Sequence, residues 1–219
     1  MTATATQLMA ASLLHRVRRS SSPGPHRTCV MLHGRSGDEN VMWVFARTLP
    51  EDWLLVAPRA IKPDPDGGFA WHPRKPDEWP PLPMFAEAVS AVVQFICELP
   101  ALYNADPRHI YLMGFSQGAA LAYATALQHP GLVQGVAGLV GFVPTETESL
   151  VKTKPLADRP VFMAVGQQDP LIPLAIAQAS ARVLREAGAD LDYHAYPTVH
   201  KLDLQGMRDL TSWWKERDR

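Results

Sequence analysis

Excess charge of either sign and long apolar runs are both absent from this sequence. The 219 residues include 21 Lys and Arg against 22 Asp and Glu, a formal net charge of −1. Such a chain has no overall field that would recruit nucleic acid or an acidic membrane surface. No apolar run approaches the ~18–20 residues that a membrane-crossing helix needs. We therefore expect no nucleic-acid partner and no transmembrane segment.

Cysteine is also scarce, with Cys29 and Cys97 the only two. Both lie in apolar runs, one typical of a strand and the other of a helix. This setting favours two buried free thiols over a disulfide or a redox pair.

Acidic residues are missing from the start of the chain, where none precedes Asp38 although several arginines do. An acid-poor, arginine- and serine-containing start resembles a transit peptide in composition. A secretory signal fits poorly, because the charges follow the apolar stretch 8–14. The alternative is a surface strand over Leu13–Arg19 within an N-terminal strand and loop region, 1–27. We favour the strand and expect a cytoplasmic protein.

What the sequence does contain is a regular alternation of strand and helix patterns. Expected strands are 28–33, 53–57, 109–115, 136–142, 161–166 and 191–196, and expected helices are 41–49, 84–99, 117–128, 173–187 and 202–214. This alternation predicts an α/β fold with a mostly parallel central sheet and helices on both faces. With 47% hydrophobic residues, the chain suits one domain over 1–219 with a substantial core and little or no cap. The proline-rich segment 58–83 is an irregular connection long enough to act as a lid or binding loop.

The most informative stretch is Gly-Phe-Ser-Gln-Gly at 114–118, between an apolar strand and a helix of small residues. Strand, Gly-x-Ser-x-Gly, helix is the layout of a nucleophile elbow, which predicts Ser116 as a catalytic nucleophile. The glycines suit it because side chains there would collide around so tight a turn. The turn also aims the backbone N–H of Gln117 at a developing oxyanion. The alternative is a glycine-rich turn that packs a helix close to a strand.

A nucleophilic serine needs a base and a carboxylate that orients the base. On such a sheet these partners follow in the order Asp then His, each just after a strand. Asp169 follows strand 161–166 and His200 follows strand 191–196, so both positions hold the required residue type. The alternative for Asp169 is an Asp-Pro turn. The other seven histidines lie in strands, at helix ends or at loop edges.

The loop after the first buried strand reads His-Gly-Arg at 33–35. We expect His33 to shape this loop, and the main-chain N–H of Arg35 to be the second oxyanion donor. The Arg35 guanidinium either meets a substrate carboxylate or lies on the surface, and we favour the surface. No metal-binding or phosphate-cradling motif is present, so we expect no metal and no organic cofactor.

Taken together, these segments resemble the phospholipase/carboxylesterase group of α/β-hydrolases, which includes acyl-protein thioesterases. The resemblance spans roughly residues 28–214, and its motifs are Leu-His-Gly-Arg-Ser-Gly-Asp-Glu at 32–39, Gly-Phe-Ser-Gln-Gly-Ala at 114–119, Gly-Phe-Val-Pro at 141–144, Gly-Gln-Gln-Asp-Pro-Leu-Ile-Pro at 166–173 and Tyr-Pro-Thr-Val-His at 196–200. It implies a triad of Ser116, Asp169 and His200 with Arg35 and Gln117 as backbone oxyanion donors.

Two positions depart from that family pattern. Ser36 stands where relatives often have glycine, and Thr198-Val199 precedes His200 where a glycine-containing turn is common. Trp71 lies in a stretch similar to the one that borders the acyl site in relatives, so it either lines the substrate groove or pins a long loop. Trp71 and Phe142 are the candidate substrate contacts, and apolar surface near Phe142 would offer a dimer contact.

The sequence therefore predicts a serine carboxylesterase that acts on small-molecule esters, thioesters or lysophospholipids through an acyl-enzyme. Other chemistries that suit the same triad are lactone or peptide hydrolysis and acyl transfer. A non-catalytic receptor or interaction protein on the same fold is the rival from another class. A monomer and a homodimer both agree with the sequence.

Overall fold

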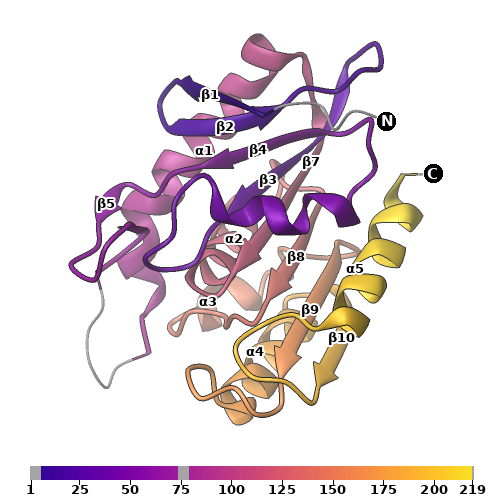
Figure 1. Ribbon diagram of the computed structural model, residues 1–219. Helices are drawn as coiled ribbons and strands as arrows, with labels where there is room; N and C mark the ends of the chain where they lie inside the picture. The colour runs from indigo at the N-terminus through magenta and orange to yellow at the C-terminus, as the bar shows by residue number, and fades with distance from the viewer. Residues whose placement is uncertain (1–5, 74–78, 219) are drawn as a thin grey trace.

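The chain is built around an eight-stranded sheet with helices on both faces (Figure 1). The computed structural model describes residues 6–73 and 79–218. The strands are β1 (Gln7–Ala10), β2 (Leu14–Arg18), β3 (His26–Leu32), β4 (Leu54–Pro58), β5 (Lys62–Pro63), β6 (Phe69–Ala70), β7 (Ala105–Phe115), β8 (Gly135–Leu139), β9 (Pro160–Gly166) and β10 (Asp190–Tyr196). The helices are η1 (Val41–Thr48), η2 (Leu82–Phe85), α1 (Ala86–Tyr103), α2 (Gln117–Gln128), α3 (Glu148–Val151), α4 (Leu174–Glu186) and α5 (Leu204–Arg217).

The order of the strands confirms the expected mostly parallel sheet. Across the sheet it runs β1-β2-β4-β3-β7-β8-β9-β10. The β1–β2 and β2–β4 pairs are antiparallel, and every pair from β4 to β10 is parallel. The favoured N-terminal strand is therefore confirmed as β2, and the edge strand β1 beside it was not expected.

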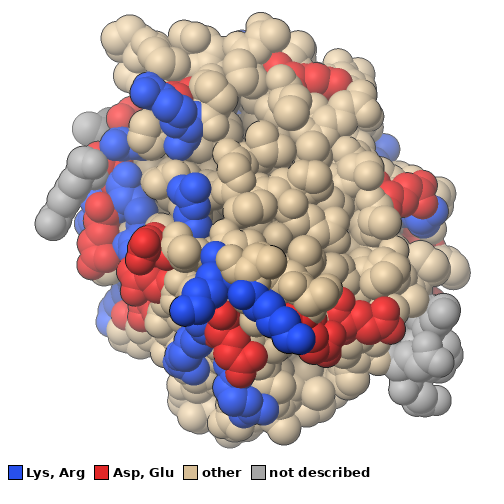
Figure 2. All heavy atoms as spheres, turned by 180° about the vertical axis from the view of Figure 1, so that it is seen from behind, with Lys and Arg blue, Asp and Glu red and all other residues tan. Residues whose placement is uncertain are grey.

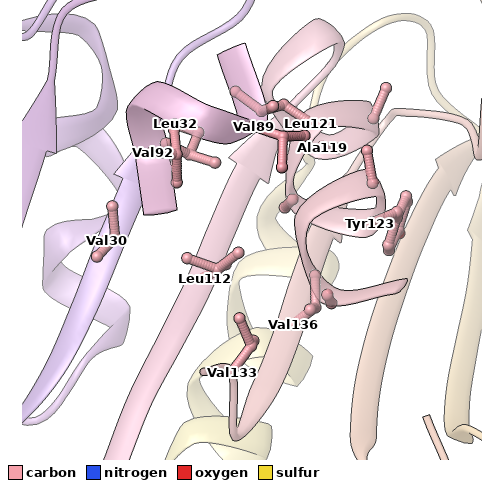
Figure 3. Packing of buried hydrophobic residues seen from close by; sticks show 14 of the residues in the cluster. Val30, Leu32, Val89, Val92, Leu112, Ala119, Leu121, Tyr123, Val133 and Val136 are labelled. Carbon is pink, nitrogen blue, oxygen red and sulfur yellow. The ribbon is translucent and has the colours of Figure 1, made fainter. Parts of the chain in front are cut away.

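Alternate residues of the central strands enter two different cores. On β3, Val30 and Leu32 join the cluster formed with α1 and α2, where the labelled side chains interdigitate (Figure 3). Their neighbours Cys29 and Met31 face the opposite way and join the cluster with η1 and α5. Helices thus cover both faces of the sheet, which is why its central strands are continuous apolar runs in the sequence.

Helix α1 is the longest helix of the described chain and packs in the first of these cores. Together with η2 it forms the stretch Leu82–Tyr103, whose length and mean hydropathy of 1.5 would suffice to cross a membrane. Its buried side chains, among them Val92, Phe95 and Leu99, belong to the cluster that covers the sheet. A stretch of this length and hydropathy was not expected from the sequence, and the packing of these side chains in the core explains why it is apolar.

Three expectations about individual segments were wrong. Cys97 is exposed on α1, while Cys29 is buried as expected and both thiols are free. Strand β8 ends at Leu139, because Val140 turns into the left-handed region at φ 44° and donates its N–H to the Ala164 carbonyl at 2.8 Å. The segment 58–83 contains ordered structure, since β5 and β6 form a two-stranded hairpin within it.

The surface agrees with the near-zero net charge on the face seen in Figure 2. Lysine and arginine lie interspersed with aspartate and glutamate there, next to a broad uncharged area. This face therefore carries no extended patch of one sign that would attract a polyanion.

Candidate active site

Five strands bring their carboxyl ends to one edge of the sheet, and the candidate residues follow those ends. The parallel register pairs Leu32 of β3 with Gly114 of β7, Phe115 of β7 with Leu139 of β8, and Gly166 of β9 with Tyr196 of β10. Segments far apart in the sequence therefore meet above this edge, as expected for a ligand site in an α/β sheet.

Ser116 occupies a strained turn between β7 and α2. Its backbone lies at φ 53° and ψ −115°, a positive φ that costs a non-glycine residue ~1–3 kcal/mol. Its N–H donates to the Leu139 carbonyl at 2.9 Å, which fixes the turn against β8. A side chain on Gly118 would overlap the Leu32 carbonyl oxygen, and one on Gly114 would overlap that of Gly118. These contacts give both glycines the role expected in a nucleophile elbow.

Asp169 and His200 form a short, buried hydrogen bond. The Nδ1 of His200 lies 2.7 Å from Oδ2 of Asp169, whose side chain is only 1% exposed. The other oxygen, Oδ1, accepts the backbone N–H groups of Leu171 and Ile172 at 2.8 and 3.0 Å. A carboxylate held this way accepts a hydrogen bond from the Nδ1–H group and so keeps the proton on Nδ1. The Nε2 lone pair of the imidazole is then available as a base.

His200 also lies against the nucleophile elbow. The ring of Phe115, the residue before Ser116, meets the imidazole edge-on with centroids 5.3 Å apart. The structure therefore brings together the segments that carry all three expected triad residues.

The loop that presents His200 has no glycine, and the structure shows what replaces it. The backbone N–H of Gln168 donates to the Thr198 carbonyl at 3.0 Å. A side chain on Gly166 would overlap the carbonyl oxygens of Thr198 and Val199. The glycine that allows the close approach thus lies at the end of β9.

Residues 33–37 form the loop in which the sequence predicts an oxyanion donor. We call it the oxyanion loop, and His33 fixes its start. This side chain is fully buried, and burial lowers the pKa of its imidazole, which favours the neutral ring. Its Nε2 accepts the N–H of Ala60 at 2.9 Å, so its Nδ1 carries the proton and donates to the Gly34 carbonyl at 2.7 Å. His33 therefore shapes the loop, as expected. A side chain on Gly34 would lie 3.4 Å from Cβ of Ser116, so the loop borders the elbow directly.

Trp71 is buried behind this loop and makes contacts that pin the chain. It is 1% exposed and donates its indole N–H to the His33 carbonyl at 2.8 Å. Its backbone N–H donates to the side-chain oxygen of Gln117 at 2.8 Å, and the same amide donates to the His72 carbonyl at 3.0 Å. Of the two expectations for Trp71, these contacts favour the loop pin.

Phe142 is also buried. It is 6% exposed and packs edge-on against Trp79 with ring centroids 5.1 Å apart. Val143 beside it is 7% exposed. These two residues therefore offer little free surface for the dimer contact that the sequence suggested.

The Arg35 guanidinium is engaged within the protein. Its Nε and Nη2 lie 2.5 and 3.0 Å from the two carboxylate oxygens of Asp64, and Nη2 lies 2.8 Å from Asp66. This hydrogen bonding raises the pKa of Arg35 and lowers the pKa of Asp64. The Arg35 side chain is 24% exposed, so it lies partly at the surface, the position that we favoured, and two carboxylates of the protein hold it there.

Sequence reasoning missed two side chains that build the site, those of Asp64 and Gln117. A signal for the first exists, because Asp-Pro-Asp-Gly-Gly at 64–68 is typical of a tight turn. The Gln117 amide had no such signal, since its partners lie 45 and 46 residues away along the chain.

Two other features of the described residues bear on ligands. Within residues 6–73 and 79–218, no three His, Cys, Asp or Glu side chains gather as a metal site would require. A cavity of about 590 Å³ lies at the opposite edge of the sheet, lined by residues that include Arg19, His26 and Tyr103. It contains no residue of the candidate active site.

The Ser116 turn, the hydrogen-bonded pair of Asp169 and His200, and the loop 33–37 lie at one edge of the sheet in the layout of a class, the α/β-hydrolases. Within that class the chain belongs to the phospholipase/carboxylesterase family, whose model matches residues 16–216.

Individual relatives agree with this assignment. Acyl-protein thioesterase 1 of Kluyveromyces lactis is 27% identical over 220 residues, which cover 91% of this chain and 96% of the relative. The carboxylesterase SOBER1 of Arabidopsis thaliana is 31% identical over 115 residues, about half of each chain. Among solved structures, a carboxylesterase from Mesorhizobium loti superposes with a TM-score of 0.81 at 22% identity, covering 96% of this chain and 98% of its own. At that identity the likeness concerns the fold.

Proposed function

We propose that this protein is a serine hydrolase that cleaves carboxylic esters or thioesters through an acyl-enzyme. The observation that carries the proposal is the 2.7 Å contact between His200 and buried Asp169 beside the strained elbow of Ser116. Family membership supports the same class of substrate.

In the proposed reaction, Nε2 of His200 removes the hydroxyl proton of Ser116 as Oγ attacks the substrate carbonyl. Asp169 holds the imidazole tautomer and stabilises its charged form. The backbone N–H groups of Arg35 and Gln117 receive the oxyanion, and each such donor contributes about 3–4 kcal/mol. His200 then protonates the leaving alcohol or thiol, and water repeats the sequence to release the acid.

The proposed substrates have short acyl chains. The connection from β8 to β9 holds only the four-residue helix α3, so it contains no helical cap. A site without a helical cap is open to solvent and offers little apolar surface for a long chain.

The test is hydrolysis of a para-nitrophenyl ester series from acetate to palmitate. We expect turnover by the wild type and its loss in Ser116→Ala, with Ser90→Ala, an exposed serine on α1, as the matched control. The chain-length optimum then sizes the acyl site. Turnover that survives Ser116→Ala, or a folded wild type that binds esters without converting them, would refute the proposal. The second outcome would favour the non-catalytic receptor.

A further inference from the structure

The hairpin formed by β5 and β6, residues 62–70, packs directly on the oxyanion loop. The backbone N–H of Phe69 donates to the Gly37 carbonyl at 2.8 Å, and these two residues form an isolated antiparallel bridge. At the turn, a side chain on Gly68 would overlap the Ser36 carbonyl oxygen. The glycine therefore allows two backbones, more than thirty positions apart in the sequence, to touch.

Asp64 ties this hairpin to the loop through its side chain. Its two oxygens accept from Nε and Nη2 of Arg35 at 2.5 and 3.0 Å, the two-pronged geometry that holds a guanidinium most rigidly. Asp64 is 2% exposed at its side chain, whereas Asp66, which also accepts from Nη2 of Arg35, is 72% exposed.

This tie acts on a strained part of the backbone. Ser36 adopts φ 61°, in the left-handed region that favours glycine. A non-glycine residue keeps such a conformation only where its surroundings hold it. His33 fixes the start of the loop, and the contact of Asp64 with Arg35 fixes its middle.

From this arrangement we infer that Asp64 is a positioning residue for the oxyanion hole. By holding the Arg35 side chain, it keeps the Arg35 backbone N–H aimed at the carbonyl oxygen of the substrate. This role rests on the proposed function. A donor that is already in place lowers the barrier without reorganising during the reaction, so a looser loop slows the chemical step more than substrate binding.

The test compares Asp64→Asn with the matched control Asp66→Asn. Asparagine at 64 keeps the oxygen that accepts the Asp66 N–H at 2.9 Å, so the turn survives, but loses the charge and the second acceptor for Arg35. Removing a whole oxyanion donor costs ~10²–10³-fold in kcat. For a displaced donor we expect about a tenfold fall in kcat with KM changed less than about twofold, and about a twofold effect at most in Asp66→Asn.

A second measurement separates positioning from general loosening. An alkyl trifluoromethyl ketone adds to the active-site serine and places an oxyanion in the hole, so its inhibition constant should rise in Asp64→Asn in proportion to the fall in kcat/KM. Arg35→Lys keeps the backbone N–H and the charge but removes the two-pronged contact. It should show the same fall in kcat/KM and rise in inhibition constant as Asp64→Asn. It also replaces Asp64→Asn if that variant does not fold.

Three outcomes would overturn the inference: folded variants with kcat within twofold of wild type, an equal loss in Asp66→Asn, or an effect on KM alone. A wild type without turnover dependent on Ser116 would refute the proposed function and, with it, the catalytic part of the inference. The structural part, that Asp64 holds residues 33–37 in place, would still be tested separately. Amide hydrogen exchange of residues 33–37 would then decide, since faster exchange in Asp64→Asn supports the role of Asp64 and unchanged exchange refutes it.

Discussion

Replacing Asp169 by asparagine should disable His200 while leaving its position unchanged. In the wild type, Oδ1 of Asp169 accepts two backbone N–H groups and Oδ2 faces Nδ1 of His200. An asparagine oxygen fits the first position, which puts the amide NH₂ against Nδ1. The imidazole then carries its proton on Nε2 and has no lone pair to offer to Ser116.

The size of the effect follows from the cost of turning the amide. The turned form restores an acceptor for Nδ1 but leaves the N–H groups of Leu171 and Ile172, now bonded at 2.8 and 3.0 Å, facing a donor. The hydrogen bond of Ile172 is buried and that of Leu171 is partly buried. A donor left without a partner in such a place costs ~1–3 kcal/mol, so both together cost ~2–6 kcal/mol. At ~1.4 kcal/mol for each factor of ten, the active form falls to roughly 1 part in 30 to 1 part in 10⁴.

We therefore expect kcat of Asp169→Asn to fall between about 30-fold and about 10⁴-fold, with an unchanged melting temperature. Steady-state ester hydrolysis measures the first, and nitrogen-15 NMR of the imidazole reports which ring nitrogen carries the proton. Asp203→Asn is the control, because Asp203 caps α5 by accepting the Gly206 N–H and asparagine caps a helix equally well. A kcat within fivefold of wild type, in a folded Asp169→Asn protein, would refute the reasoning.

Two further outcomes are expected. Gly118→Ala should lose about 1–3 kcal/mol of unfolding free energy and most activity, because the added Cβ overlaps the Leu32 carbonyl oxygen. Gly131→Ala is the control, since its Cβ meets nothing within 4 Å, and it should lose little stability or activity. Chemical denaturation measures the stability and the ester assay measures the activity. Several hydrogen bonds hold the pKa of Asp106 well below its ordinary 3.8, and the bond from the backbone N–H of Arg108 has the largest effect. The ionised Asp106 carboxylate therefore stabilises the fold above about pH 4, and this stabilisation is lost as the pH falls further. Asp106→Asn should accordingly be less stable than wild type at pH 7, and the gap should close in melts toward pH 2; a constant gap would contradict this.

Much of the fold could be predicted because local pattern and final structure agree. Helix α2 occupies residues 117–128 as expected, since a glycine elbow starts it and His-Pro-Gly ends the pattern. Strand β9 is a continuous apolar run that is buried along most of its length, whereas edge strand β10 is recognised by alternating apolar and polar residues. The order of these strands in the chain predicted where Asp169 and His200 follow, but not the 2.7 Å contact between them.

The remainder depends on contacts between distant residues, which a local pattern does not carry. Valine favours strands, yet Val140 adopts φ 44° and ends β8, although its N–H still bonds to Ala164 of β9. The 62–70 hairpin has only two residues in each strand, and a side-chain pair 29 positions apart ties it to the oxyanion loop. Edge strand β1 is mostly exposed and therefore lacks the apolar alternation that reveals a strand.

The Gln117 amide also has a consequence for the entropy of the chain. By accepting from Trp71 and donating to His72, it acts as a cross-link that divides the long connection between Pro58 and Leu82 into two shorter loops. Closing a loop costs ~0.6 kcal/mol more for each doubling of its length, so the gain from division is modest. The larger consequence is that the two parts of the connection move independently. Because Trp71 and His72 are fixed to Gln117, a substitution after His72 does not displace the residues before it. The stretch that supports the oxyanion loop can therefore stay in register while the rest of the connection varies in length or composition.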